Sequence, residues 1–208
     1  MIDGQHRCHA VIETGISIPA IVVSGLADDV FDTKDCGKRR GAADVLATRG
    51  EKYYAALAAS LQVIDRYMKG MLANKGVRYS NSEIELLLEK YPEARESAAF
   101  SVKVGTKRLV PNSLMIGLHY LMSQFDRDAA NEFWTMLIAG SNLDSDSPIF
   151  LLRERLVANT VAKARLRTPY IAALTIKAWN AWRSGKTVKT LRWSESGKTK
   201  EGFPMLSR

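Results

Sequence analysis

YYAALAASLQVIDRYMKGML, residues 53–72, decides the fold class of this 208-residue chain. Its apolar residues at spacings of three and four are Leu57, Leu61, Ile64 and Met68. This spacing places them on one face of a helix whose other faces can meet solvent. The stretch therefore predicts a helical protein whose core forms between such faces.

Further helices follow along the chain. Ser80 and Glu83 have the spacing of a capping box, in which each side chain satisfies a free backbone N–H at a helix start. Residues 113–125 and 127–139 have helical periodicity and are separated at Asp126. We therefore expect a multi-helix body.

Two later helices are expected at Ser-Pro and Thr-Pro pairs. In Ser147-Pro148 and in Thr168-Pro169, a capping hydroxyl precedes a proline suited to the first helical turn. After Gly185 the chain becomes polar, which predicts a partly ordered tail at the end. The expected division is an N-terminal element over residues 1–50, a helical domain over 51–193 and a tail over 194–208.

One strand is predicted ahead of this body. Residues 5–14 read as a helix stopped by Gly15, and residues 18–24 (IPAIVVS) form a continuous β-branched run. A single strand needs partners for its backbone groups, and residues 100–104 and 187–193 are only weak candidates. The sheet would then be completed by late strands, by another chain or by segments outside this sequence. The expected fold class is mainly α, with a small partial α/β element at the N-terminus.

The charge is concentrated at one end of the chain. The net charge is +8, but residues 145–208 carry 13 basic and 4 acidic residues, a local charge of +9, and the first 144 residues come to −1. A polyanionic partner should therefore contact the C-terminal third. No apolar run is long enough to cross a membrane, and the N-terminus lacks the pattern of a secretory signal. We expect a cytoplasmic protein.

The motif IDGQHR at residues 2–7 is the clearest functional signal. Gly4 allows a sharp turn into a helix whose first amides are free, and Gln5, His6 and Arg7 surround that end with donors, an arrangement that suits an anion. The segment resembles the ParB/sulfiredoxin-like domains, in which this motif ends a strand and precedes a helix. The resemblance implies that Gly4, Gln5, His6 and Arg7 contact nucleotide phosphates.

The same resemblance implies an incomplete pocket. ParB-like domains have strands before the motif, and this sequence starts immediately ahead of it. Residues 25–50, 178–183 (AWNAWR) and 191–193 (LRW) resemble segments of phage-borne and prophage-borne proteins with the same start. The resemblance therefore implies a phage or mobile-element protein.

A second basic group, Lys38, Arg39 and Arg40, lies between two glycines at the start of an expected helix. Backbone amides and cations together could bind phosphate there. The alternative is neutralisation by the aspartates just upstream, which are Asp28, Asp29, Asp32 and Asp35.

The C-terminal third mixes tryptophans with cations. The candidate nucleic-acid surface consists of Arg165, Arg167, Lys177, Arg183, Lys186, Lys189 and Arg192. Cations neutralise phosphates, and exposed aromatic rings can stack on bases. The competing interpretation, which we favour, places Trp179 or Trp182 in the core, with the cations around them as a general polyanion surface.

Catalytic and metal patterns are poor. His6, Cys8, His9 and Cys36 supply enough ligand atoms for zinc, but the two cysteines do not have a CxxC spacing, so no metal site is predicted. His119 lies in an apolar helix and is expected to be a hydrogen-bonded core residue. The sequence identifies no catalytic residue and no cofactor.

These observations lead to one hypothesis and two alternatives. The hypothesis is a ParB-like protein that binds DNA or nucleoprotein and has no catalytic activity. The first alternative is a nucleotide-binding enzyme, either a nucleoside triphosphatase or a nuclease. The second is an anti-defence inhibitor that binds a host nucleic-acid complex. The lone predicted strand also allows a homo-oligomer.

Overall fold

The structure is a computed structural model that describes residues 4–26, 41–74, 76, 78–106, 108–141, 143–162 and 165–207. The chain divides into two units, Met1–Arg40 and Gly41–Arg208. The first unit contains helix α1 (Gln5–Thr14), as the sequence predicts. Gly15 ends this helix in the left-handed conformation (φ 66°), and its N–H donates to the Val11 carbonyl at 2.9 Å.

The predicted strand over residues 18–24 is wrong for the described chain. Residues 15–26 form neither helix nor strand, and the side chains of Ile21 and Val22 are 95% and 86% exposed. An extended segment becomes a strand only when a neighbour supplies backbone partners. The two candidate neighbours do not, because residues 100–104 end a helix and residues 187–193 are irregular. The described part of the protein is therefore all-α, without the expected α/β element.

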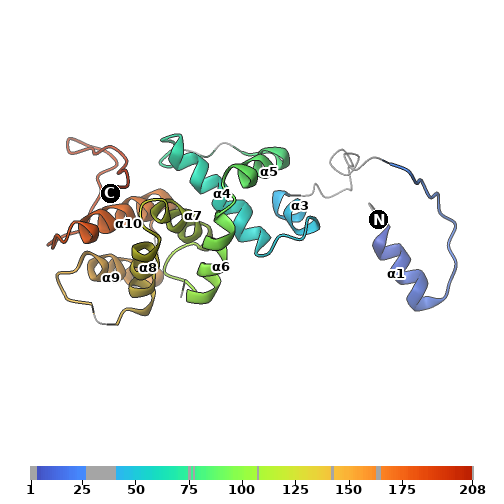
Figure 1. The fold of residues 1–208 in the computed structure, drawn as a ribbon, viewed down its shortest axis with the longest axis horizontal. Helices are drawn as coiled ribbons and strands as arrows, with labels where there is room; N and C mark the ends of the chain where they lie inside the picture. The colour runs from blue at the N-terminus through green and yellow to red at the C-terminus, as the bar shows by residue number, and fades with distance from the viewer. Residues whose placement is uncertain are drawn as a thin grey trace. The chain divides into compact units, whose positions relative to one another are not determined.

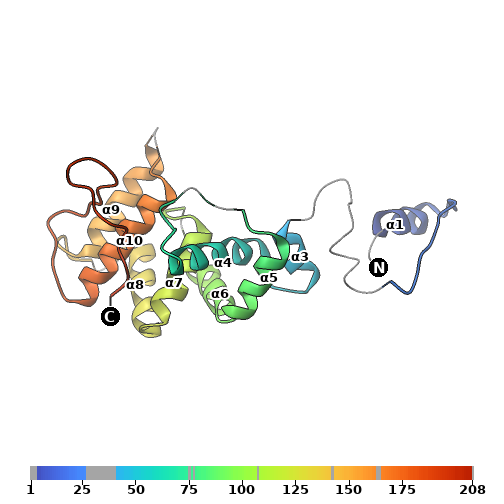
Figure 2. The same ribbon diagram turned by 90° about the horizontal axis from the view of Figure 1, so that it is seen from above.

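The second unit, hereafter the body, is built entirely from helices in its described part (Figure 1). They are α3 (Ala42–Thr48), α4 (Tyr54–Met68), α5 (Asn81–Lys90), α6 (Ala94–Val104), α7 (Asn112–Ser123), α8 (Arg127–Ala139), α9 (Pro148–Val161) and α10 (Thr168–Arg183). Helix α7 packs against α4, α6 and α8, while α9 packs against α8 and α10 (Figure 2). None of the helices in the described ranges is long and apolar enough to cross a membrane.

The predicted face of α4 forms part of the core. Leu57, Leu61 and Ile64 are completely buried. Met68, the last residue of the helix, is exposed instead. Trp134, which lies in the helix predicted over residues 127–139, is buried in the same core.

Several predicted helix starts are confirmed. The Ser80 hydroxyl accepts from the Glu83 N–H at 3.2 Å, and the Glu83 carboxylate accepts from the Ser80 N–H at 2.7 Å. Asp126 caps α8 by accepting from the Ala129 N–H at 3.0 Å. Side-chain acceptors thus define the starts of α5 and α8.

The two proline-containing starts differ from each other. The Ser147 hydroxyl caps α9 by accepting from the Ile149 N–H at 3.3 Å, as predicted. The predicted Thr168 cap is wrong, since Arg167 is the N-cap residue and Thr168 is the first helical residue. The helix therefore begins one residue earlier than the Thr-Pro pair suggests, without a side-chain cap.

Candidate nucleic-acid interface

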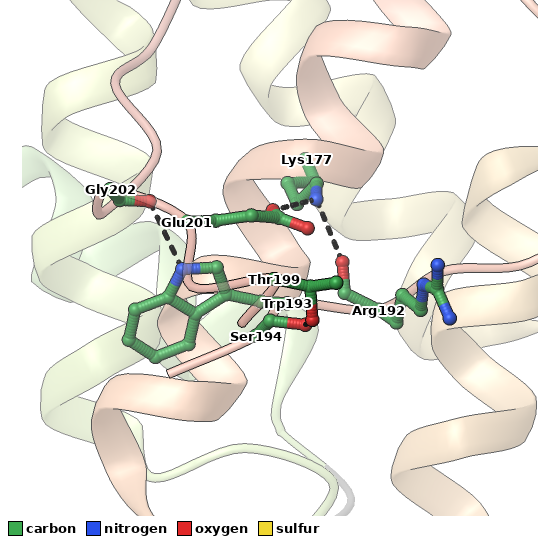
Figure 3. A network of polar contacts seen from close by, with 7 residues as sticks. All are labelled: Lys177, Arg192, Trp193, Ser194, Thr199, Glu201 and Gly202. Carbon is green, nitrogen blue, oxygen red and sulfur yellow. Dashed lines mark hydrogen bonds and ion pairs between the residues drawn. The ribbon is translucent and has the colours of Figure 1, made fainter. Parts of the chain in front are cut away.

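The C-terminal segment folds back along α10 and forms the candidate interface. Trp193 is 7% exposed and packs edge-on against Phe203, with ring centroids 5.4 Å apart, and near Tyr170 at 6.0 Å. Its indole N–H donates to the Gly202 carbonyl at 3.0 Å (Figure 3). A buried ring with a satisfied N–H holds residue 193 beside the first turn of α10.

Lys177 fixes the same segment to the middle of α10. Its Nζ donates to the Arg192 carbonyl at 2.8 Å and to a Glu201 carboxylate oxygen at 2.5 Å (Figure 3). The Glu201 N–H in turn donates to the Ser194 carbonyl at 2.8 Å, which closes the loop over residues 194–201. The backbone around Arg192 is therefore anchored from two sides.

The last described residues extend this anchoring. Asn180 donates to the Met205 carbonyl at 2.8 Å and accepts from the Ser207 N–H at 3.0 Å. The Leu206 N–H donates to the Tyr67 hydroxyl at 2.6 Å. Burial raises the pKa of Tyr67, so its hydroxyl stays neutral. The segment for which the sequence predicts a partly ordered tail makes defined contacts with α4 and α10.

Three cations recur at every third residue between the end of α10 and Trp193. Lys186, Lys189 and Arg192 are all exposed, and we call them the cation row. Val188 and Leu191 alternate with them and are half-buried, and Leu191 packs against the core. Figure 3 shows the Arg192 side chain pointing away from Lys177 and Glu201. The cation row therefore faces solvent on an anchored backbone.

The predicted surface residues fall into two groups. In the first, Arg167 pairs with Glu195 at 2.9 Å, Lys177 with Glu201, and Arg183 with Asp126 at 2.9 Å. The second group has no ion pair with an acidic residue of the described ranges and consists of Arg165, Lys186, Lys189 and Arg192. Only this second group can neutralise phosphates without first giving up an internal partner.

Sequence reasoning missed two cations beside the row. Lys198 and Lys200 are exposed in the loop over residues 194–201, and neither pairs with a described carboxylate. Sequence reasoning assigned them to the tail. These lysines alternate with small polar residues, a pattern that is typical of disordered segments. The tryptophan just before the loop, Trp193, could have indicated that the loop is held against the body, because a tryptophan is usually buried.

The tryptophans of this region are core residues. Trp179 is completely buried, and Trp182 is half-buried against Phe133 and Trp179, each with ring centroids 5.7 Å away. The core interpretation of this pair is confirmed. The aromatic residues of the region pack inward while the cation row points outward.

The predicted N-terminal phosphate residues lie at the start of α1. Gly4 has φ 90°, a conformation that glycine adopts without strain, and leads into a first turn without acidic residues. Gln5, His6 and Arg7 are exposed there. Lys38, Arg39 and Arg40 lie outside the described residues. Phosphate binding by either group stays a prediction.

His119 is the hydrogen-bonded core residue that the sequence predicts. Its Nδ1 lies 2.9 Å from the Ser97 hydroxyl and its Nε2 lies 2.9 Å from the Asn131 side-chain oxygen. The ring stacks on Phe100 with centroids 4.2 Å apart and lines a cavity of about 160 Å³. Burial lowers its pKa below the ordinary 6.5, and Arg127 contributes in the same direction. Within the ranges that the structure describes, no three potential metal ligands come together.

Comparison with known proteins gives no relative. No family model, no curated protein sequence and no solved structure matches this chain.

Proposed function

We propose that this protein binds DNA or nucleoprotein without catalysing a reaction on it. The observation that carries the proposal is the cation row, three exposed cations on a backbone held by Trp193 and Lys177. Anchored cations lose less conformational freedom on binding than cations on a free tail. The row also lies in the third of the chain that carries a charge of +9.

The N-terminal motif adds a second phosphate contact to this proposal. The exposed Gln5, His6 and Arg7 at the start of α1 can meet an anion, as the resemblance to ParB-like domains implies. ParB-like descent, an origin in a phage or mobile element and a cytoplasmic location belong to the same proposal. They are supported by the motif and the composition.

The test is an anisotropy titration of labelled DNA with the full chain and with Lys186→Glu/Lys189→Glu/Arg192→Glu. The matched control is Lys52→Glu/Lys103→Glu/Arg155→Glu, exposed cations elsewhere on the body that make no ion pair with a described residue. Each triple reversal lowers the net charge from +8 to +2. We expect the first variant to lose binding and the control to retain most of it. Equal loss in both variants would reject an anchored interface and leave only non-specific charge attraction.

The two alternatives predict different results. A nucleotide-dependent enzyme would release or absorb heat in calorimetry with nucleoside triphosphates, and would lose the signal on Arg7→Ala. An inhibitor of a host complex would co-purify with a host protein after nuclease treatment.

A further inference from the structure

We infer that the interface recognises double-stranded DNA through its phosphates alone, without stacking on bases. The inference rests on the proposed function and names its substrate class. It follows from three features of the same region: where the tryptophans lie, what surrounds the most accessible one, and how the cations are spaced.

The first feature is the burial of the rings that could stack. Single-strand binding proteins gain affinity from each base that stacks on an aromatic side chain. Stacking needs an exposed ring face. Trp179 is 0% and Trp193 7% exposed, and Trp193 is further fixed by its bond to Gly202. Neither ring can receive a base without unpacking the body.

The second feature is the environment of Trp182. This half-buried ring lines a groove of about 470 Å³ between α8 and α10. The same groove is lined by the carboxylates of Asp126, Asp128 and Glu132, and the single cation there, Arg183, is already paired with Asp126. A base stacked on Trp182 would carry its phosphate toward this acidic group. The repulsion between the phosphate and these carboxylates would oppose binding.

The third feature is the linear arrangement of the cations. The segment over residues 186–195 runs back along α10, because Lys186 follows its last turn, Lys177 in its middle holds Arg192, and Arg167 at its start pairs with Glu195. The 16 residues of α10 span about 24 Å. A duplex of that length carries about 14 phosphates on its two strands.

Arg165 lies at the end of α10 where Arg167 meets Glu195, so it extends the charge of the row. The cations are thus distributed along α10, from Lys186 at its end to Arg165 near its start. Duplex DNA is straight over the length of this helix, since its persistence length is about 50 nm. Single-stranded DNA would have to be ordered along these cations without gaining any stacking energy. Its charge density is also lower than that of duplex DNA.

The salt dependence of binding follows from the number of available cations. Arg165 and the cation row provide four phosphate contacts along α10, which by themselves predict a slope of about −3 to −4 in log K against log salt, and a contact from Lys198 or from Lys200 would add about −0.9 each. Affinity for duplex should therefore fall about a hundredfold when salt rises from about 50 to about 200 mM. Reversing the three charges of the cation row should make this slope shallower by about three.

The experiment compares a 20-base-pair DNA duplex with a 20-nucleotide oligothymidine strand, using the full chain. Anisotropy of a labelled probe measures affinity, and intrinsic tryptophan emission at saturation reports stacking. We expect the duplex to bind at least about tenfold more tightly, two duplexes of unrelated sequence to bind alike, and tryptophan emission to stay constant. Trp182→Leu, which removes the aromatic ring, should leave both affinities unchanged.

The outcomes separate the inference from the proposed function. Equal or tighter binding of the single strand, with quenched tryptophan emission, would overturn phosphate-only recognition of duplex but keep nucleic-acid binding. A weaker affinity of Trp182→Leu for either probe, with an unchanged urea midpoint, would overturn it as well. If neither probe binds at about 50 mM salt, the proposed function itself fails.

Discussion

Replacing Gly117 with alanine should destabilise the body at the crossing of α4 and α7. A Cβ atom at this position would lie 2.7 Å from Val63 Cγ1 and 2.9 Å from Val63 Cβ. Ordinary carbon contacts are about 3.5–4.0 Å, so the two helices would have to separate by about 1 Å at this point. Valine cannot move aside easily, because its χ1 angle is restricted in a helix.

The magnitude follows from two opposing effects. Overpacking of a core costs about 1–3 kcal/mol, and a contact of 2.7 Å with a β-branched side chain places Gly117→Ala in the upper half of this range, about 2–3 kcal/mol. Alanine recovers up to about 1 kcal/mol, since it favours the helix more than glycine does. The expected net loss is about 1–2 kcal/mol in the free energy of unfolding.

Urea denaturation followed by tryptophan fluorescence would measure the loss, because Trp134 and Trp179 are buried in the same core. Gly202→Ala is the matched control, since a Cβ there would meet nothing within 4 Å. Val63→Ala in the Gly117→Ala background should restore part of the stability by removing the clash. If Gly117→Ala is as stable as wild type, or if the two substitutions add independently, the packing argument is refuted.

Three further predictions concern single side chains. Ser80→Ala removes the capping box of α5 and should cost about 1 kcal/mol in urea denaturation, whereas Ser82→Ala, an exposed serine two residues further along, should change little. Asp126→Ala should lower the urea midpoint more than Arg183→Met, because Asp126 both caps α8 and pairs with Arg183; the reverse order would contradict the capping role. His119 has a lowered pKa in the folded protein, so the unfolded chain binds its proton more readily and stability should fall as pH drops below about 6.5. The decrease in the free energy of unfolding between about pH 7.5 and 5.5, measured by urea denaturation, should be smaller in His119→Gln than in wild type. If the decrease is the same in both proteins, groups other than His119 cause it.

The helix starts could be predicted because their determinants are local. Ser80 with Glu83, Asp126 and Ser147 each act on amides two or three residues away, so their spacing in the sequence is sufficient. The strand over residues 18–24 could not be decided in this way. Its β-branched residues favour an extended backbone, but a strand also needs a second segment to pair with it.

The interface was predictable in composition but not in detail. The sequence locates the basic third, yet Lys177, Arg167 and Arg183 find their carboxylates 24, 28 and 57 residues away. Such long-range pairs follow from the packing of the helices and leave no signal in local spacing. That Trp179 and Trp182 pack toward the core could be predicted from the sequence, because residues three apart lie on the same face of a helix.

The hydrogen bond between Tyr67 and the Leu206 backbone joins residues 139 positions apart. Contacts of such separation carry a large entropy of loop closure and tend to form late, whereas neighbouring helices such as α6, α7 and α8 can associate early. During folding, the helices of the body would therefore assemble first, and the contact of Leu206 with α4 would form last. The cation row is held to α10 by the contacts of Lys177 with Arg192 and of Tyr170 with Trp193, which join residues only 15 and 23 positions apart. The surface by which we propose that the protein binds DNA would therefore form before residue 206 docks on α4.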